Sequence, residues 1–383
     1  SGIRNQRVLR MISGYAMRIG VVRTKDSPCR CAESVSVGLR ALGHEIVLAD
    51  SEEIEARALA LASTCDLVLD HTDTFRGRGM YRPLVRLLLE NWGAAVIGPD
   101  AAACFLADNK AAAKRKLADA GIPVPPGIVI RAASWELPAW LRPPLVLKPA
   151  FEHMSRGVRV ARTEPEAREA ASELLEALRQ PILVESFIPG RELAVSLLEG
   201  PDGLEALPVL EWSSGGSGAD ILTERFKLMD AESADRGVAR AALSSTQAGA
   251  IDSLARRAFR VLGLRDYGRF DLRLSPEGTP FFLEANTTPS LEPMEALAIS
   301  AEWAGLDYAA LVARMIASAA RRHAGSKGSG APRARVNLPG GPVELEIPPG
   351  VPAPPESSIE LARCIDVRPG ERVLDLGCGS GLL

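Results

Sequence analysis

The sequence predicts an α/β protein whose N-terminal part contains a parallel β-sheet with helices on its faces. Across roughly the first hundred residues, short apolar runs alternate with stretches that have helical spacing. Strands that alternate with helices form parallel sheets. Farther along, two strands carry polar side chains at alternate positions. The chain has 383 residues, 46% of them hydrophobic, which is sufficient for the cores of two or three domains.

The N-terminal sheet is expected to bind a ligand at one edge. The expected strands are residues 18–22, 45–49, 66–70 and 95–98, and the expected helices are residues 34–42, 52–62 and 81–91. Parallel sheets bind ligands beyond the carboxyl ends of their strands. Asp70, His71 and the glycine turn at residues 77–79 are therefore candidates for that edge. A structural, hydrogen-bonded role is an equally open alternative for His71.

Charge and hydropathy exclude several classes of protein. The net charge is −3 and no basic surface stands out, which argues against nucleic-acid binding. No run of about eighteen apolar residues occurs, so no membrane span is expected. No signal peptide is recognised, residues 1–16 are expected to be an N-terminal extension, and a cytoplasmic location is expected.

The cysteines do not suggest a metal site. Six cysteines are scattered along the chain, and Cys29 and Cys31 are the only close pair. No Cys or His cluster near them in the sequence completes a zinc site. Reduced thiols are therefore expected.

A phosphate-binding loop is expected between two strands at residues 145–149 and 158–161. The first strand carries Lys148, and the loop contains Ser155 among other small residues. Backbone N–H groups in such a loop can contact phosphate oxygens while the Lys supplies positive charge. The alternative for Lys148 is a solvent-facing side chain.

An adenosine pocket is expected after the strand at residues 182–186. The hydrophobic pair Phe187 and Ile188 could line an adenine cleft, and the carboxylates of Glu185 and Glu192 could bind ribose hydroxyls. The alternative for the two glutamates is a solvated strand edge.

A metal–phosphate site is expected where two further strands pair. Arg269 and Asp271 share one face of the first strand, and Glu284 and Asn286 share one face of the next, because strand side chains alternate. Two carboxylates and an amide oxygen suit Mg²⁺, and the Arg could hold an oxyanion.

Taken together, these motifs resemble the ATP-grasp ligases, and more closely the D-alanine–D-alanine ligases. The motifs that carry the resemblance are Lys110, Lys148-Pro149, Glu185 with Gly190-Arg191-Glu192, Gly268-Arg269-Phe270-Asp271, and Glu284-Ala285-Asn286-Thr287. The resemblance covers roughly residues 17–322. It implies an ATP-grasp fold with a parallel α/β domain at residues 17–109 and two α+β parts at residues 110–190 and 191–322.

The resemblance also implies a role for each motif. Lys110, Lys148 and Ser155 would contact ATP phosphates, Phe187 and Ile188 the adenine, and Glu185 and Glu192 the nucleoside. Asp271, Glu284 and Asn286 would hold two Mg²⁺ ions, with Mn²⁺ as an alternative, and Arg269 would stabilise an oxyanion. Residues 215–231 would form a lid. Lys227 is the candidate for the γ-phosphate with Arg225 as its competitor, and an ordinary exposed loop is the alternative for the segment.

Some residues depart from the pattern of the D-alanine ligases. Met154 replaces a Ser of the family's substrate network, and Ser290 and Glu292 lie where the family places a run that holds a carboxylate. A Glu there would repel a carboxylate and could attract an amine. The substrate is therefore expected to differ from D-alanine. The candidate substrate-binding residues are Glu33, His71, Glu152, Ser290 and Glu292.

The C-terminal part suggests a second, incomplete domain. Residues 323–356 are rich in Gly, Ser, Ala and Pro and are expected to be a linker. Residues 369–381 are expected to form a strand followed by a glycine turn, and they resemble motif I of class I S-adenosylmethionine-dependent methyltransferases. Residues 357–383 are expected to be the truncated start of such a Rossmann-like domain, with S-adenosylmethionine a ligand only of a full-length parent.

The resemblance implies an ATP- and Mg²⁺-dependent ligase that joins a carboxylate to an amine through an acyl phosphate. The expected partners are small amino acids or peptides, and a homodimer is implied by the family. D-alanine–D-alanine ligase itself is one alternative, and a nucleotide-binding or substrate-presenting partner of a methyltransferase is another. Carboxylation or phosphotransfer is a third, although no biotin-carrier motif is present.

Overall fold

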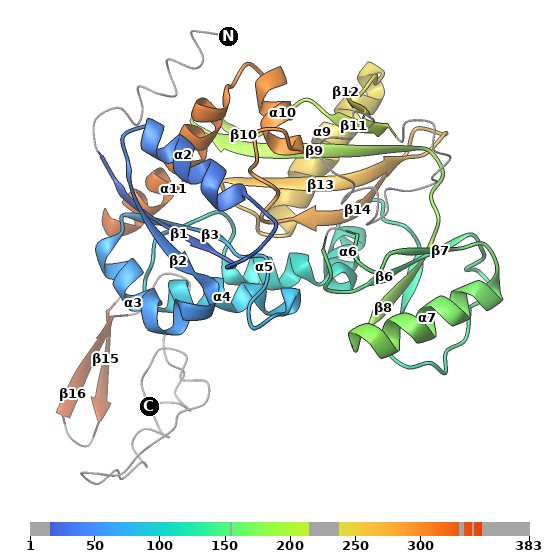
Figure 1. Ribbon diagram of the computed structural model, residues 1–383, viewed down its shortest axis with the longest axis horizontal. Coiled ribbons are helices and arrows are strands. Elements are labelled where there is room, and N and C mark those ends of the chain that lie inside the picture. Colours follow the sequence, from blue (N-terminus) through green and yellow to red (C-terminus); the bar gives the residue numbers. More distant parts are fainter. Residues whose placement is uncertain (1–15, 154, 214–236, 329–332, 339–340, 347–383) are drawn as a thin grey trace. The chain divides into compact units, whose positions relative to one another are not determined.

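The computed structural model describes residues 16–153, 155–213, 237–328, 333–338 and 341–346 (Figure 1). The chain divides into two compact units, residues 1–319 and 320–383. The three main sheets and all the site residues discussed below lie in the first unit.

The first sheet is parallel, as predicted, and has the strand order β2-β1-β3-β4. Its strands are β1 (Arg18–Arg23), β2 (Glu45–Asp50), β3 (Leu67–His71) and β4 (Val96–Ile97). Its helices are α2 (Cys31–Ala41), α3 (Ile54–Thr64) and α4 (Arg82–Asn91), with 3₁₀ turns η1 (Ser51–Glu53) and η2 (Gly79–Tyr81). Val22, Leu61 and Leu89 are fully buried between the sheet and the helices. Helix α2 begins at Cys31, earlier than the predicted residue 34, which places Cys31 in its first turn.

Helices α5 (Ala101–Asp108) and α6 (Lys110–Asp119) follow directly. Asp100 caps α5 by accepting a hydrogen bond from the Ala103 amide, and Asn109 caps α6 in the same way from the Ala112 amide. Such caps stabilise helix N-termini by satisfying free amides.

The second sheet is antiparallel and has the order β5-β8-β6-β7. Its strands are β5 (Gly127–Ile130), β6 (Leu145–Pro149), β7 (Arg159–Ala161) and β8 (Ile182–Ser186). Helix α7 (Glu164–Leu178) lies along one face, where Ala167 and Leu174 pack against Leu147 and Val184 (Figure 1).

The third sheet is antiparallel and has the order β12-β11-β9-β13-β14, with β10 pairing with β9. Its strands are β9 (Arg191–Gly200), β10 (Gly203–Ala206), β11 (Leu210–Ser213), β12 (Gly237–Arg240), β13 (Tyr267–Leu274) and β14 (Pro280–Asn286). Helix α9 (Ser245–Val261) and α6 pack on this sheet around Phe270 and Phe282, whose rings meet edge to face at 5.5 Å. Helix α10 (Ala296–Trp303) packs near β9 through Ala296 and Ala194.

Helix α11 (Tyr308–Gly328) continues into the second unit, where β15 (Arg333–Leu338) and β16 (Gly341–Glu346) form an antiparallel hairpin. Part of the stretch predicted as a linker is therefore regular structure. Residues 357–383 lie outside the described residues, and the domain boundaries stay a prediction.

No helix among the described residues is by itself long and apolar enough to cross a membrane. One bent pair, Ala296–Trp303 with Tyr308–Ala324, meets the length and composition criteria only when both helices are counted together.

Candidate active site

The predicted pairing of the two polar strands is confirmed. Strands β13 and β14 are antiparallel, with Asp271 opposite Glu284 and Arg269 opposite Asn286. Opposite residues of an antiparallel pair lie on the same face, so these four side chains are neighbours. We call them the strand-pair site. A β-bulge follows Asp271, and bulges commonly reorient side chains beside active sites.

The strand-pair site is held by bidentate pairing. Arg269 donates from Nε and Nη2 to the two Asp271 oxygens at 2.7 and 3.0 Å, and the Asn286 amide donates to Asp271 at 3.2 Å. Burial alone would lower the pKa of Arg269, but the Asp271 carboxylate raises it above its ordinary value. The guanidinium is therefore charged and fixed. Two carboxylates and an amide oxygen form a donor set that fits Mg²⁺.

A pocket of about 740 Å³, open to solvent, lies beside the strand-pair site. Ten of the predicted site residues line it: Lys110, Lys148, Glu152, Ser155, Glu185, Phe187, Ile188, Glu192, Asp271 and Glu284. They come from α6, from the second sheet and its loops, and from the third sheet. Apolar side chains such as Val146 and Leu283 also line it, and a mixed lining of this kind is usual for a ligand site.

Three lysines lie among the acidic groups of this region. Lys148 Nζ is 3.2 Å from Glu185, Lys110 Nζ is 3.4 Å from Glu284, and Lys114 forms a buried ion pair with Glu185. The alternative of a solvent-facing Lys148 is therefore wrong, because its side chain is 13% exposed. Lys114 was missed by sequence reasoning. It lies one helical turn after Lys110, on the same face of α6, and this spacing was the available signal.

Because of Lys114, the free energy of unfolding is expected to vary with pH in the alkaline range. Burial lowers the pKa of Lys114 from 10.5 to about 8, with Glu185 opposing the shift and Lys148 adding to it. Between these values the unfolded chain binds more protons than the folded one, so the free energy of unfolding rises with pH. We expect wild type to gain stability relative to Lys114→Met between pH 8 and 10, by up to about 1.4 kcal/mol per pH unit.

Urea denaturation at a series of pH values measures this difference. Lys116→Met is the matched control, because Lys116 lies exposed on the same helix and should leave the pH profile unchanged. Parallel profiles of wild type and Lys114→Met would contradict the assignment.

The predicted adenine residues Phe187 and Ile188 line the pocket. The Arg273 guanidinium stacks on the Phe187 ring, 4.9 Å from its centroid, and donates to the Gly190 carbonyl at 2.8 Å. A charged group stacked on the ring fixes Phe187 in place. Arg273 was not predicted as a site residue, although it follows Asp271 on the same face of its strand by the alternation of side chains.

Gly190 cannot carry a side chain. Its φ is +118°, and an added Cβ would lie 2.1 Å from the Leu274 carbonyl oxygen. We expect Gly190→Ala to lower the free energy of unfolding by about 1–3 kcal/mol and to weaken nucleotide binding. Gly203→Ala is the control, since Gly203 has a φ of +103° with open space around it. Chemical denaturation measures the free energy of unfolding of both variants. Equal decreases in the two variants would show that the close approach of Gly190 to the Leu274 carbonyl is unimportant.

The predicted substrate residues do not all come together. His71 Nε2 lies 3.4 Å from the Pro289 carbonyl, and Ser290 Oγ lies 3.3 Å from Cys31 Sγ. Glu292 accepts a hydrogen bond from the Arg30 amide at 2.9 Å. These contacts bring the end of β3 and the start of α2 against the segment after β14.

Two other candidates lie elsewhere. Glu33 pairs with Arg23, and Glu152 lines the pocket, where it accepts a hydrogen bond from Gln180 at 2.8 Å. Lys227, Arg225, the predicted lid at residues 215–231 and Met154 lie outside the described residues.

The fold brings a His from a distant part of the sequence to the cysteine pair. One ligand atom each of Cys29, Cys31 and His71 lie within 4.8 Å of one another. Hydrogen bonding to Cys29 lowers the pKa of the Cys31 thiol most, His71 lowers it further, and burial opposes both. Burial would lower the pKa of His71, but Cys31 raises it to about 8. The cysteines of the described residues are free thiols.

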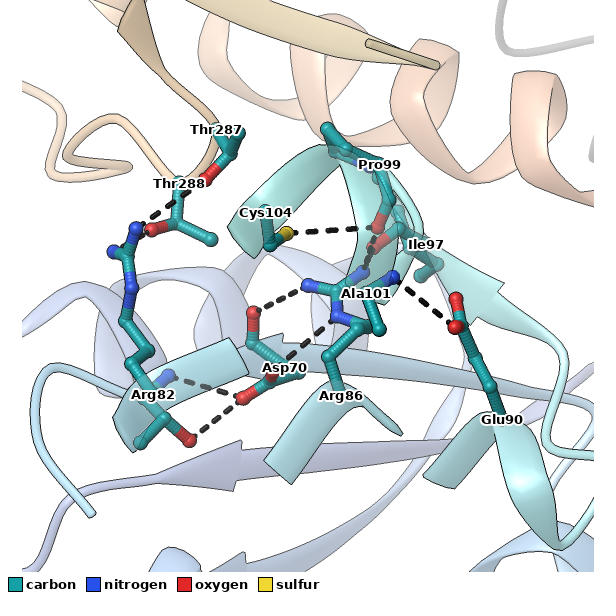
Figure 2. A network of polar contacts seen from close by, with 12 residues as sticks. Asp70, Arg82, Arg86, Glu90, Ile97, Pro99, Ala101, Cys104, Thr287 and Thr288 are labelled. Atoms are coloured by element: carbon teal, nitrogen blue, oxygen red, sulfur yellow. Dashed lines mark hydrogen bonds and ion pairs between the residues drawn. The ribbon is translucent and has the colours of Figure 1, made fainter. Parts of the chain in front are cut away.

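A network of buried polar side chains around Arg82 and Arg86 fixes the first sheet (Figure 2). Arg86 contacts Asp70 Oδ2 at 3.2 Å and donates to the carbonyls of Ile97 and Pro99 at 2.8 and 2.9 Å. Arg82 pairs with the buried Asp108. Arg82 also donates to the hydroxyls of Thr287 and Thr288, directly after the strand-pair site.

A parallel α/β layer, two antiparallel sheets with helices, and a pocket lined by lysines and carboxylates define an ATP-grasp enzyme. A family model described as D-ala D-ala ligase C-terminus matches residues 117–317. The solved D-alanine–D-alanine ligase of Bacillus anthracis complexed with ATP has a TM-score of 0.67 at 22% identity, covering 81% of this chain and 100% of that chain. The VanG D-Ala:D-Ser ligase of Enterococcus faecalis has a TM-score of 0.65 at 21% identity, covering 80% of this chain and 100% of that chain.

Sequence relatives agree with the fold. A D-alanine–D-alanine ligase from Gloeobacter violaceus is 32% identical over 312 residues, 78% of this chain and 98% of that protein. An uncharacterized protein, y4sG, from Sinorhizobium fredii is 31% identical over 304 residues, 78% of this chain and 89% of that protein. The chain belongs to the D-alanine–D-alanine ligase family and is an ATP-grasp ligase that forms a carbon–nitrogen bond. The match to residues 117–317 does not include residues 357–383, so the methyltransferase start stays a prediction.

Proposed function

We propose that this ligase uses ATP and Mg²⁺ to join the carboxylate of one amino acid or peptide to the amine of another, through an acyl phosphate. The observation that carries the proposal is the convergence of Lys110, Lys148, Asp271 and Glu284 on one pocket. Phosphoryl transfer requires mainly positioning and neutralisation of charge. Lysines beside a pair of carboxylates supply both, because the carboxylates can hold Mg²⁺ while the lysines attract phosphate oxygens.

Each group in the pocket has a task in this proposal. Phe187, fixed by Arg273, would contact the adenine face, and Lys148 would hold phosphate oxygens. Bound Mg²⁺ would offset charge on the phosphates. Arg269 would face the developing oxyanion when the amine attacks the acyl phosphate, since its guanidinium is already oriented by Asp271.

We propose further that the substrate is not D-alanine. Glu292 accepts a hydrogen bond from the Arg30 amide, and Ser290 contacts the buried Cys31, so this edge carries the carboxylate of Glu292. A carboxylate favours an amine and repels a second carboxylate. The Met at position 154 supports the same conclusion from the sequence.

The direct test is a screen of amino acids and dipeptides for ADP release with Mg²⁺ present, followed by mass detection of the product. We expect one carboxylate–amine pair other than two D-alanines to release ADP and to give a product lighter by one water than the summed substrates. Asp271→Asn should abolish the release. The proposal fails if no pair releases ADP, or if two D-alanines are the best pair.

We also propose that residues 357–383 begin a methyltransferase domain, because residues 369–381 resemble its glycine motif. Calorimetric binding of S-adenosylmethionine by a longer form of the chain would support this, and no binding would contradict it. We also propose the predicted domain boundaries, a homodimer and a cytoplasmic location for this chain. Sedimentation of the purified chain tests the homodimer.

A further inference from the structure

Two cysteines and a histidine form a buried group away from the residues that line the nucleotide pocket. We call Cys29, Cys31 and His71 the thiol–imidazole cluster. Cys31 is 0% and His71 4% exposed, and Cys29 is half-buried. One ligand atom from each lies within 4.8 Å of the others.

The topology of the first sheet brings these residues together. Strands β1 and β3 are parallel neighbours, with Arg23 at the end of β1 paired with His71 at the end of β3. The chain leaves β1 toward α2, whose first residue is Cys31, so both thiols return to the edge where β3 ends. The Cys31 amide lies 3.5 Å from Cys29 Sγ, which keeps the two thiols on one side of the loop.

The imidazole is oriented as in a metal-bound histidine. A carbonyl only accepts hydrogen bonds, so the contact between His71 Nε2 and the Pro289 carbonyl requires a proton on Nε2. His71 Nδ1 is buried and has no hydrogen-bond partner among the described residues. Metal-binding histidines usually donate one ring N–H to a backbone carbonyl or carboxylate and use the other nitrogen as the ligand.

The spacing is close to that of a zinc site. Zn–S bonds of about 2.3 Å and Zn–N bonds of about 2.0–2.1 Å imply tetrahedral ligand separations of about 3.5–3.8 Å. Ligand atoms within 4.8 Å of one another therefore need to approach by at most about 1.3 Å. Thiolate and imidazole ligands select zinc over magnesium.

We propose that Cys29, Cys31 and His71 bind one Zn²⁺ ion, with the fourth position open to an oxygen or nitrogen ligand. Three protein ligands and an open position are typical of zinc that contacts a substrate or water. The hydroxyl of Ser290 and the carboxylate of Glu292 lie 3.3 and 3.9 Å from Cys31 Sγ, so oxygen atoms are already close to this position. The thiol–imidazole cluster shares no residue with the strand-pair site, where Asp271, Glu284 and Asn286 offer oxygen atoms that suit Mg²⁺.

The test is a metal titration of the full chain in excess Mg²⁺ and ATP, so that the strand-pair site is not available to zinc. We expect one zinc per chain by elemental mass spectrometry. Cobalt in place of zinc should give the near-ultraviolet charge-transfer band of a thiolate ligand, which carboxylate ligands do not give.

Substitutions locate the metal. Cys29→Ser, Cys31→Ser and His71→Asn should each weaken zinc binding at least about 100-fold in chelator competition, because even loss of an outer hydrogen bond to a ligand costs 10–100-fold. The triple variant Cys65→Ser/Cys364→Ser/Cys378→Ser is the control and should bind zinc like the parent. Thermal unfolding of each variant identifies any that fail to fold.

Two outcomes would overturn the proposal. The first is a folded Cys29→Ser/Cys31→Ser variant that binds zinc as tightly as the parent or keeps the cobalt band. The second is a parent chain that takes up no zinc. If thiol titration of that chain then shows that Cys29 and Cys31 oxidise together, the cluster is a redox pair and not a metal site.

Discussion

Replacing Arg269 with Met is expected to lower kcat/KM by about 100- to 1000-fold while changing the affinity for ATP little. The Arg269 side chain is 13% exposed and donates two hydrogen bonds to Asp271. Its guanidinium therefore needs little rearrangement to meet a developing oxyanion. Preoriented charge of this kind acts on the transition state more than on the bound substrate. Steady-state kinetics on the pair identified by the ADP-release screen measures the loss.

Arg273→Met is the matched control for this prediction. Arg273 lies on the same strand, but it lines the pocket and stacks on Phe187. Its loss should raise KM for ATP with a smaller effect on kcat. If Arg269→Met keeps the kcat of wild type, Arg269 does not stabilise the transition state.

Arg86→Ala is expected to lower the free energy of unfolding by about 3–5 kcal/mol, the largest effect on stability that we expect of a single substitution. Arg86 is 1% exposed and bonds to the Asp70 carboxylate and to the carbonyls of Ile97 and Pro99 (Figure 2). Its removal takes the donor away from the buried Asp70 carboxylate and from three carbonyls, those of Asp70, Ile97 and Pro99. Urea denaturation followed by circular dichroism measures the change.

The double variant Asp70→Asn/Arg86→Met separates charge from packing. The Met fills most of the space of the Arg side chain, and the Asn removes the isolated carboxylate. The double variant should therefore be more stable than Arg86→Ala, because a buried ion pair can often be replaced by uncharged groups without loss of stability. If both variants unfold at the same denaturant concentration, the carboxylate is not the cause of the loss.

Local patterns were sufficient to predict much of the fold and the pocket. The alternation of strands with helices predicted the parallel sheet, and alternation along β13 and β14 predicted which side chains share a face. The strand that carries Lys148 and the segment from Glu185 to Glu192 were predicted from spacing within a few residues. These features depend on neighbours in the chain, so the sequence contains the information directly.

The rest depends on contacts between distant residues. His71 meets Pro289 across 218 positions, and Arg82 meets Thr287 across 205. Nothing in the neighbourhood of Cys29 and Cys31 indicates that the end of β3 completes their group, because this follows from the pairing of β1 with β3. Lys114 was missed for a related reason, since its burial depends on how α6 packs between two sheets.

The segment from Glu284 to Glu292 serves two regions of the protein at once. Its first residues belong to the strand-pair site, and its last residues are held by Arg82, His71 and Cys31 of the N-terminal part. A ligand that shifts these later contacts therefore also moves the groups that would hold Mg²⁺. Binding of the amino acid and of the nucleotide should then be energetically coupled, and by linkage each should change the affinity for the other by the same factor.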